Sequence, residues 1–324
     1  MKIDVHAHYI PEKFFGGPGN VRVTREGSDE VLFSSGRGTA SGKGIYDIEF
    51  RLKEMDAQGV DMHVLSVLPP ALFVNHIEPD KALAACRSIN NAFAETVSRH
   101  SGRFVAIANL PMQAPEEAAR ELERAVKDLG MKGAEICTNI NGKNLDDKSF
   151  APFYKKMQEL DAPVFLHPSN VLGADRLSRY HLGNLIGNPT DTAVAAASLI
   201  FGGILKEFPR LKFYLAHGGG SCPYLRGRWE HGWRVRPEAK VNIQNPPSEY
   251  LPLLYFDSLA HSGPALNFLV ETMGPERVML GTDYPADMSD TDPVKTIASL
   301  PHLSDAEREM IYGGNAMRLL KIGG

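Results

Sequence analysis

The chain lacks several features that mark particular classes of protein. It has only three cysteines, Cys86, Cys137 and Cys222, which are too few and too widely spaced for a disulfide framework, so we expect reduced thiols. No apolar run approaches the roughly 20 residues that span a bilayer. No apolar signal core follows the opening MKID. The sequence therefore predicts a cytoplasmic protein with no membrane partner.

The chain also lacks any block of like charges. Its 35 basic and 39 acidic residues are spread along 324 positions and leave a net charge of −4. Binding to nucleic acid or to a strongly charged partner usually requires clustered charge of one sign. We therefore expect no nucleic-acid partner. The hydrophobic fraction of 43% is that of an ordinary globular protein with a substantial core.

What the chain does contain is a regular series of short apolar runs. Most of them are nearly continuous, as expected of strands that are buried on both faces. Eight such runs are expected to form strands: 2–9, 60–69, 103–111, 132–139, 162–168, 212–219, 253–260 and 277–285.

Helical patterns fill the intervals between these runs. The segment 114–130 is typical, because it begins with Pro115 and acidic residues and ends with lysine and glycine, as the helix dipole favours. Repeated alternation of strand and helix predicts an α/β fold, a (β/α)8 TIM barrel that occupies residues 1–324 as a single domain. An open doubly wound sheet is less favoured, because no glycine-rich phosphate turn follows the first run. The other expected helices are 47–59, 78–100, 148–161, 189–209, 263–274, 292–300 and 304–320.

Segment 16–46 interrupts this alternation. It is rich in glycine and serine and contains two alternating stretches, VRVT and EVLFS, separated by REGSD. Such alternation predicts a small β-hairpin inserted after the first strand, in preference to an irregular loop. In a barrel this insertion is expected to lie over the mouth formed by the C-terminal ends of the strands, where active sites are found.

Polar side chains recur at the C-terminal ends of four predicted strands. The first ends in His6 and His8, whose two-residue spacing places both imidazoles on one strand face. The fifth ends in His167, the sixth in His217 and the eighth in Asp283. These ends meet in one ring of a barrel, and imidazole with carboxylate suits a divalent metal such as zinc. Three histidines and the aspartate would leave an open position for substrate, although the residues alone do not say which histidine is spare. Five other histidines are assigned structural or surface roles: His63, His76, His100, His231 and His302.

These motifs are part of a sequence similarity to a known family that extends over most of the chain. The segments DVHAHY, FLHPS, AHGGG and GTDYP, together with FRLKEMDAQGVD, PPSEYL and MGPERVMLGTDYP, resemble the amidohydrolase superfamily. The likeness is greatest to its branch of metal-dependent decarboxylases, typified by 2-amino-3-carboxymuconate-6-semialdehyde decarboxylase. It covers most of the chain and is weak only over 16–46. The resemblance implies a lyase of aromatic-compound catabolism that removes CO2, without oxidation, from a muconate-semialdehyde-like or hydroxybenzoate-like carboxylate.

The resemblance also assigns roles at the strand ends. It implies that His6, His8, His167 and Asp283 hold the metal, and that His217 is the catalytic acid/base beside it. Asp283 could share the proton transfer. One divalent metal is expected, zinc first and manganese second. The fourth predicted strand, KGAEICTN, ends without the lysine that bridges two metals in hydrolytic members.

On the substrate side, the resemblance points to arginines, whose two-pronged donor suits a carboxylate. Arg51 matches an arginine that contacts the substrate carboxylate. Arg228 and Arg236 both match an arginine that reaches the neighbouring subunit's site, which implies a homodimer. Asn184 falls where the typical member has a tryptophan, so the resemblance leaves the exact small-molecule carboxylate open.

The same ligands would serve other reactions. A hydrolase that cleaves a lactone, amide or carbon–carbon bond, or a hydratase, would use the same metal-bound water. A non-catalytic metal-binding scaffold is less favoured, because His217 would then be spare. Release of CO2 distinguishes the first interpretation from the others.

Overall fold

The computed structural model describes residues 1–11, 14, 22–26, 30–34, 39–68 and 74–323. All eight regions predicted to form strands do so, each over a shorter length than predicted. The third strand is interrupted and counts as two elements. The strands are β1 (Ile3–His8), β5 (Met62–Ser66), β6 (Phe104–Ala106) with β7 (Ala108–Asn109), β8 (Ala134–Cys137), β11 (Val164–His167), β12 (Phe213–Leu215), β13 (Leu254–Asp257) and β14 (Val278–Met279).

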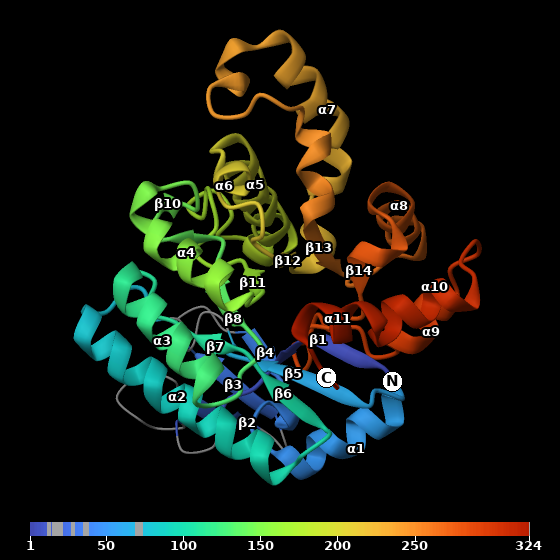
Figure 1. The fold of residues 1–324 in the computed structure, drawn as a ribbon. Helices are drawn as coiled ribbons and strands as arrows, with labels where there is room; N and C mark the ends of the chain where they lie inside the picture. The colour runs from blue at the N-terminus through green and yellow to red at the C-terminus, as the bar shows by residue number, and fades with distance from the viewer. Residues whose placement is uncertain (12–13, 15–21, 27–29, 35–38, 69–73, 324) are drawn as a thin grey trace.

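These strands close into a ring. Parallel pairing joins β1 to β5 and β5 to β6, and then runs from β7 through β8, β11, β12 and β13 to β14. The ring closes because the Val5 amide donates to the Leu280 carbonyl at 2.9 Å and Ala7 forms a parallel bridge with Tyr284. Helices surround the strands (Figure 1). The predicted TIM barrel is confirmed, and all parallel strand ends therefore point to one mouth.

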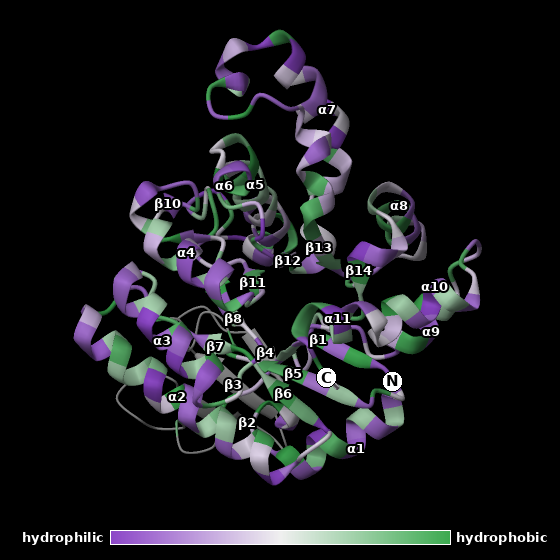
Figure 2. Cartoon of the chain, viewed as in Figure 1, coloured by the Kyte–Doolittle hydropathy of each residue, from purple (hydrophilic) through white to green (hydrophobic). Residues whose placement is uncertain are grey.

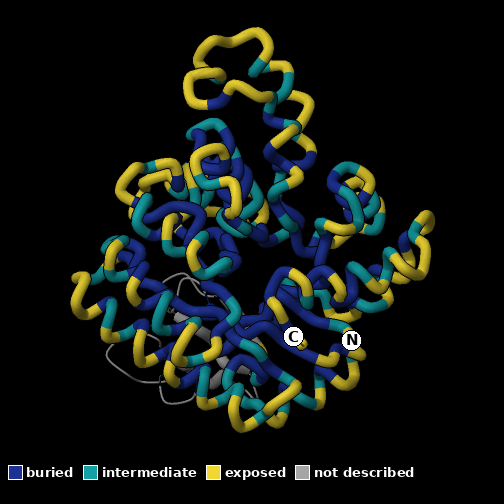
Figure 3. Tube along the Cα trace, viewed as in Figure 1, coloured by how far each residue is buried: buried dark blue, intermediate teal, exposed yellow. Residues whose placement is uncertain are grey.

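The helices cover the barrel with their apolar faces, so the strands are buried while the outer helix surfaces are hydrophilic and exposed (Figures 2 and 3). The first helix begins where predicted, because the Asp47 carboxylate accepts from the Phe50 amide at 2.9 Å. The helices are α1 (Ile48–Gln58), α2 (Pro79–Arg99), α3 (Pro115–Lys127), α4 (Ala151–Leu160), α5 (Asn188–Phe201), α6 (Ile204–Glu207), α7 (Cys222–Val235), α8 (Gly263–Met273), α9 (Pro293–Ala298), α10 (Asp305–Glu309) and α11 (Asn315–Leu320).

Two predicted helices are not continuous. The one expected over 189–209 breaks between α5 and α6, where Gly203 has a left-handed φ of 82° that ends a right-handed helix. The one expected over 304–320 contains a π-helical turn, Met310–Gly314, between α10 and α11. Helix α7 was not predicted. It carries Gly227 and Gly232, which lower helix propensity, and its far end extends away from the barrel (Figure 1).

The insertion contains β2 (Arg22–Glu26) and β3 (Glu30–Ser34), which pair antiparallel with Val23 opposite Phe33. A third strand, β4 (Thr39–Ser41), pairs with β3. The remaining residues of 16–38 lie outside the described part of the chain, and the position of the insertion over the mouth stays a prediction. A short antiparallel pair, β9 (Asn139–Ile140) and β10 (Lys143–Asn144), follows β8. Of the helices described, none is both long and apolar enough to cross a bilayer.

Candidate metal centre

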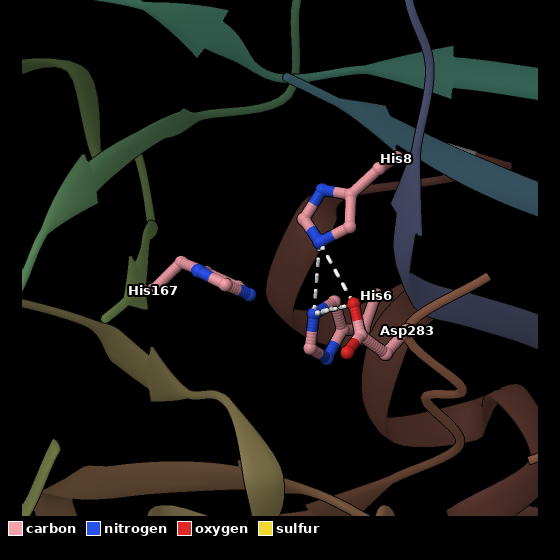
Figure 4. A group of neighbouring side chains, drawn as sticks. All are labelled: His6, His8, His167 and Asp283. Atoms are coloured by element: carbon pink, nitrogen blue, oxygen red, sulfur yellow. Dashed lines mark hydrogen bonds and ion pairs between the residues drawn. The ribbon is translucent and has the colours of Figure 1, made fainter. Parts of the chain in front are cut away.

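Four side chains that are up to 277 positions apart in the sequence meet at the barrel mouth. His6 and His8 extend from β1, His167 from the end of β11, and Asp283 from the segment after β14 (Figure 4). All four are buried, and one ligand atom from each lies within 4.8 Å of the others. The structure thus brings together the four residues expected to hold a metal.

Three of the four ligand atoms are already close. The Nε2 atoms of His6 and His8 are 3.2 Å apart, and Asp283 Oδ1 lies 3.3 Å from the first and 3.0 Å from the second. Ligand atoms bound about 2.0–2.2 Å from one ion lie at about this separation. A divalent ion therefore fits between these three atoms.

The fourth ligand gives independent support. His167 Nε2 is buried and has no hydrogen-bond partner among the described residues. Its ring points toward the other three side chains, and no hydrogen bond or ion pair joins it to them (Figure 4). Leaving a buried polar atom unpaired costs free energy, so a native structure normally supplies a partner. A metal ion would be that partner.

Each imidazole of the cluster has a hydrogen-bond partner at Nδ1. Nδ1 of His6 lies 2.7 Å from Asp257 Oδ2, Nδ1 of His8 lies 3.0 Å from Ser66 Oγ, and Nδ1 of His167 lies 3.1 Å from the Pro168 carbonyl. A hydrogen bond from Nδ1–H fixes the tautomer in which Nε2 carries the lone pair. All three rings can thus present Nε2 to one ion.

Asp4 holds the backbone around the cluster. Its carboxylate accepts from the His6 amide at 2.9 Å, and from the amide and hydroxyl of Thr282 at 3.1 and 2.6 Å. The Asp283 amide donates to the His6 carbonyl at 2.8 Å. Asp283 itself has a left-handed φ of 64°, a conformation that costs a non-glycine residue about 1–2 kcal/mol. These hydrogen bonds offset that strain and align Asp283 with β1.

The charges in the cluster favour one ionised carboxylate and neutral His8 and His167. Burial lowers the pKa of His8 and lowers that of His167 well below its usual value. Burial also opposes a charge on His6, but Asp283 and Asp257 outweigh it and raise the pKa of His6 to about 10. For Asp283, burial is outweighed by His6 and by hydrogen bonds from its histidine neighbours, so its pKa falls well below the usual value. A metal ion must therefore displace the His6 proton.

His217 lies beside the cluster and outside the ligand set. Its Nε2 is 3.6 Å from Asp283 Oδ2, and its ring centroid is 5.3 Å from those of His6 and His167. Its side chain is 14% exposed, more than that of Asp283 at 9%. It also has a left-handed φ of 56°. An imidazole at the open side of the cluster, next to an ionised ligand, is placed to exchange a proton with a bound substrate.

The predicted substrate residues lie in different places. Arg51 on α1 is fully buried, with Nε donating to the Gly44 carbonyl, Nη1 3.1 Å from His63 Nδ1, and Nη2 donating to the His8 carbonyl. Its guanidinium also lies over the Tyr284 ring at 4.7 Å. In this position Arg51 supports the strand that carries His8.

The other predicted substrate residues are on the periphery. Arg228 is exposed on α7, and Arg236, also exposed, caps that helix and pairs with Glu238 at 3.2 Å. Asn184 is half-buried in a π-helical turn, Gly183–Gly187. Within the described part of the chain, no hydrogen bond or ion pair joins these three residues to the ligands. Their roles stay predictions.

Asp4 and Asp257 were both missed from the sequence. Asp257 ends β13, is fully buried, and contacts both His6 and the backbone of His217. The available signal was a carboxylate within the apolar run LLYFDSLA, at the C-terminal end of the seventh predicted strand. A charged residue in such a run is rarely buried without a specific partner.

Comparison with known proteins supplies further findings. A sequence model of the amidohydrolase family matches residues 3–322. The chain is 38% identical to the 2-amino-3-carboxymuconate-6-semialdehyde decarboxylase of Dictyostelium discoideum, over 99% of this chain and 91% of that protein. It is 33% identical to a gamma-resorcylate decarboxylase of Rhizobium sp. (strain MTP-10005), over 85% and 87% of the two chains. The crystal structure of a dihydroxybenzoic acid decarboxylase from Polaromonas sp. JS666, with bound manganese and the inhibitor 2-nitroresorcinol, superposes with a TM-score of 0.84 at 26% identity, over 100% and 97% of the chains.

Proposed function

The chain belongs to the amidohydrolase family, and from this premise we propose that it is a metal-dependent decarboxylase that releases CO2, without oxidation, from an unsaturated or aromatic carboxylate. The observation that carries the proposal is the buried cluster of His6, His8, His167 and Asp283 with His217 beside it. The named relatives that align over most of the chain are decarboxylases of such substrates, which supports the same reaction class.

The four clustered side chains would hold one divalent ion. We propose zinc, because three imidazoles and one carboxylate suit it, with manganese as the second choice in view of the Polaromonas structure. A bound ion supplies Lewis acidity, which orients and polarises a substrate oxygen. The chain contributes buried side chains, with the three imidazoles held by hydrogen bonds at Nδ1.

His217 would carry the proton. Direct loss of CO2 from an sp2 carbon leaves a poorly stabilised carbanion, so protonation of that carbon should come first. His217 would donate this proton, and Asp283, whose Oδ2 is 3.6 Å from His217 Nε2, would stabilise the charged imidazole. The bond to the carboxylate then breaks and CO2 leaves, the new C–H bond remains in the product, and a proton from solvent would return His217 to its starting state.

We further propose a homodimer, in which Arg228 or Arg236 binds a substrate carboxylate in the partner's site. Two observations support this. Helix α7 extends from the barrel (Figure 1), and its Tyr224 and Val235 are 81% and 56% exposed, as expected of a surface that a second copy covers. Asn184 would contact the same substrate. We place the protein in the cytoplasm, with residues 1–324 as one domain and the insertion bordering the mouth.

Arg51 remains a proposed carboxylate ligand, and its test separates two roles. An R51K variant keeps the charge and loses the two-pronged donor. A raised KM at unchanged metal content supports substrate binding. A lowered melting temperature with an unchanged KM supports the structural role that its buried contacts indicate.

The central experiment measures products. The zinc- or manganese-loaded protein is mixed with 2-amino-3-carboxymuconate-6-semialdehyde and with dihydroxybenzoates, and CO2 is measured against substrate consumed. One CO2 per substrate, abolished by a chelator and restored by metal, is the expected result. A new acid without CO2 indicates a hydrolase, and a hydrated product indicates a hydratase.

A further inference from the structure

The buried carboxylate of Asp257 contacts both halves of the centre, which are the metal-binding cluster, through His6, and the segment that carries the proposed acid/base, His217. Asp257 Oδ2 lies 2.7 Å from His6 Nδ1 and accepts from the His217 amide at 2.9 Å. Asp257 Oδ1 accepts from the Gly218 amide at 2.6 Å and from the Leu259 amide at 3.1 Å. The side chain is fully buried, so no water competes for these oxygens. These four hydrogen bonds go to His6, to the segment of His217, and to the residues that follow Asp257 itself.

The backbone segment that begins at His217, the proposed acid/base, needs a negatively charged partner such as Asp257. The four residues from His217 to Gly220 all have positive φ values, of 56°, 61°, 74° and 59°. Successive amides in turns of this kind point to one side and form a concavity that binds negative charge. Asp257 supplies the charge to the first two amides. The left-handed backbone at His217, which a histidine rarely adopts, is thereby held in one conformation.

His6 needs the Asp257 carboxylate for a different reason. A proton on His6 Nδ1 that is donated to Asp257 leaves Nε2 as the lone-pair atom. That atom is the one within 3.3 Å of both His8 Nε2 and Asp283 Oδ1. Without an acceptor at Nδ1, the ring could rotate or take the other tautomer, and the ligand set would lose its first member.

We propose that Asp257 is a positioning residue that couples the two halves of the centre: through one oxygen it orients His6 for the metal, and through both it fixes the backbone that places the His217 ring. The assignment of proton transfer to His217 rests on the proposed function, whereas the orientation of His6 does not. If Asp257 couples the two halves, the single substitution D257N should lower both the zinc affinity, which depends on His6, and kcat, which depends on His217.

The test is D257N, compared with D191N. The amide of D257N has one acceptor oxygen and cannot serve both His6 and the amides of His217 and Gly218. Asp191 is a matched control, because it is also buried and accepts from the Leu172 amide at 3.1 Å and the Asn139 side chain at 3.0 Å. Asp191 touches none of the four ligands in the described structure. Should D257N not accumulate as folded protein, D257E replaces it, since it keeps the charge and displaces it by one methylene.

Three measurements test separately the role of Asp257 toward His6 and its role toward His217. Competition with a zinc chelator should show a 10–100-fold loss of zinc affinity in D257N and little change in D191N. Nuclear magnetic resonance of the zinc-loaded protein should show that the His6 Nδ1–H proton and the His217 and Gly218 amides exchange faster with solvent in D257N. At saturating metal, kcat of D257N should remain below that of wild type while KM changes little. D257E should show the same losses to a smaller degree.

The outcomes distinguish the two proposals. Wild-type zinc affinity and slow His6 Nδ1–H exchange in D257N would overturn the role toward the ligand. Unchanged amide exchange at His217 and Gly218 would overturn the role toward the acid/base. If wild-type protein releases no CO2 from any substrate, the proposed function fails, while the affinity and exchange measurements still decide the role of Asp257.

Discussion

The metal cluster and helix α7 differ in how much of their structure the single chain provides. At the cluster, each imidazole has a hydrogen-bond partner at Nδ1, and Asp4 joins the strand of His6 to the segment of Asp283. Along the outer part of α7, most residues are exposed (Figure 3), and Arg236 has an exposed partner in Glu238. One region is complete in the monomer, and the other has surface that remains uncovered.

This difference matches the two tasks proposed for the protein, which are bond chemistry at the metal and selection of the substrate. Groups that handle bond chemistry must be held within fractions of an ångström, and buried hydrogen bonds from a rigid barrel do this. Groups that select a substrate can vary without disturbing the barrel, and the residues proposed for this task, Asn184, Arg228 and Arg236, lie in a turn and on or next to α7. Substitutions in the first region should therefore affect metal and rate, and those in the second should affect KM.

The largest effect is expected from H167A, which removes one ligand of the cluster. The loss of zinc affinity should exceed the roughly 10–100-fold cost of losing an outer hydrogen-bond partner, and activity should fall below detection. Zinc content after dialysis, measured by elemental analysis, checks this. The control is H231A, an exposed histidine on α7. Full zinc content in H167A would remove His167 from the ligand set.

The next largest effect is expected from H217A. His217 lies outside the ligand set, so the variant should keep its metal while kcat falls by about 10²–10⁴-fold, the usual contribution of a positioned acid or base. Elemental analysis and steady-state kinetics on the same preparation check both parts. A loss of metal parallel to the loss of rate would assign His217 to coordination instead.

A smaller and graded effect concerns pH. In the metal-free protein Asp283 and Asp257 raise the pKa of His6 to about 10 against the effect of burial, so a proton occupies this ligand at neutral pH. This raised pKa stabilises the metal-free fold below about pH 6.5, and the contribution is lost as pH rises through about 10. Metal must displace the proton, so metal affinity should rise about tenfold per pH unit between pH 6 and 8.

Calorimetry checks this directly. Zinc titrations in buffers of different ionisation enthalpy should report release of about one proton per zinc at pH 7. A binding enthalpy that is independent of the buffer would contradict a protonated His6. The D191N variant should behave as wild type, because Asp191 contacts none of the ligands in the described structure.

The sequence predicted the cluster well because it depends on two simple regularities. Alternate residues of a strand share one face, which paired His6 with His8, and parallel strand ends meet at one mouth, which added His167, His217 and Asp283. The resemblance to the family, not the strand pattern, indicated that His217 is not a ligand. Asp257 escaped because its importance depends on the left-handed turn at His217, which the sequence shows only as a run of glycines.

Arg51 and α7 escaped for other reasons. Periodicity does not say whether a helical arginine is buried, and Arg51 is buried with Nη2 donating to the His8 carbonyl, while its contact with a substrate carboxylate stays a prediction. In α7, Leu225, Trp229 and Trp233 pack on one side of the helix, and Trp229 lies against Phe201 at 6.0 Å between ring centroids. This stripe was missed in the sequence because Gly227 and Gly232 interrupt the segment and lower its helix propensity.

The smallest effect is expected on α7, and it tests whether that helix acts in the neighbouring subunit. R228A should raise KM by about tenfold, since a hydrogen bond to a charged group contributes about 1.5–3 kcal/mol. R226A on the same helix is the control, because its guanidinium instead donates to the Thr272 carbonyl at 3.4 Å. R236A is measured alongside to separate the two candidate arginines.

Co-expressed H217A and R228A chains then decide whether Arg228 acts in its own subunit or in the partner's. If Arg228 serves the partner's site, a mixed dimer has one site with both defects and one with neither, so activity at low substrate should exceed that of either variant alone. An arginine that acts within its own subunit leaves every site defective, and mixing would then restore nothing.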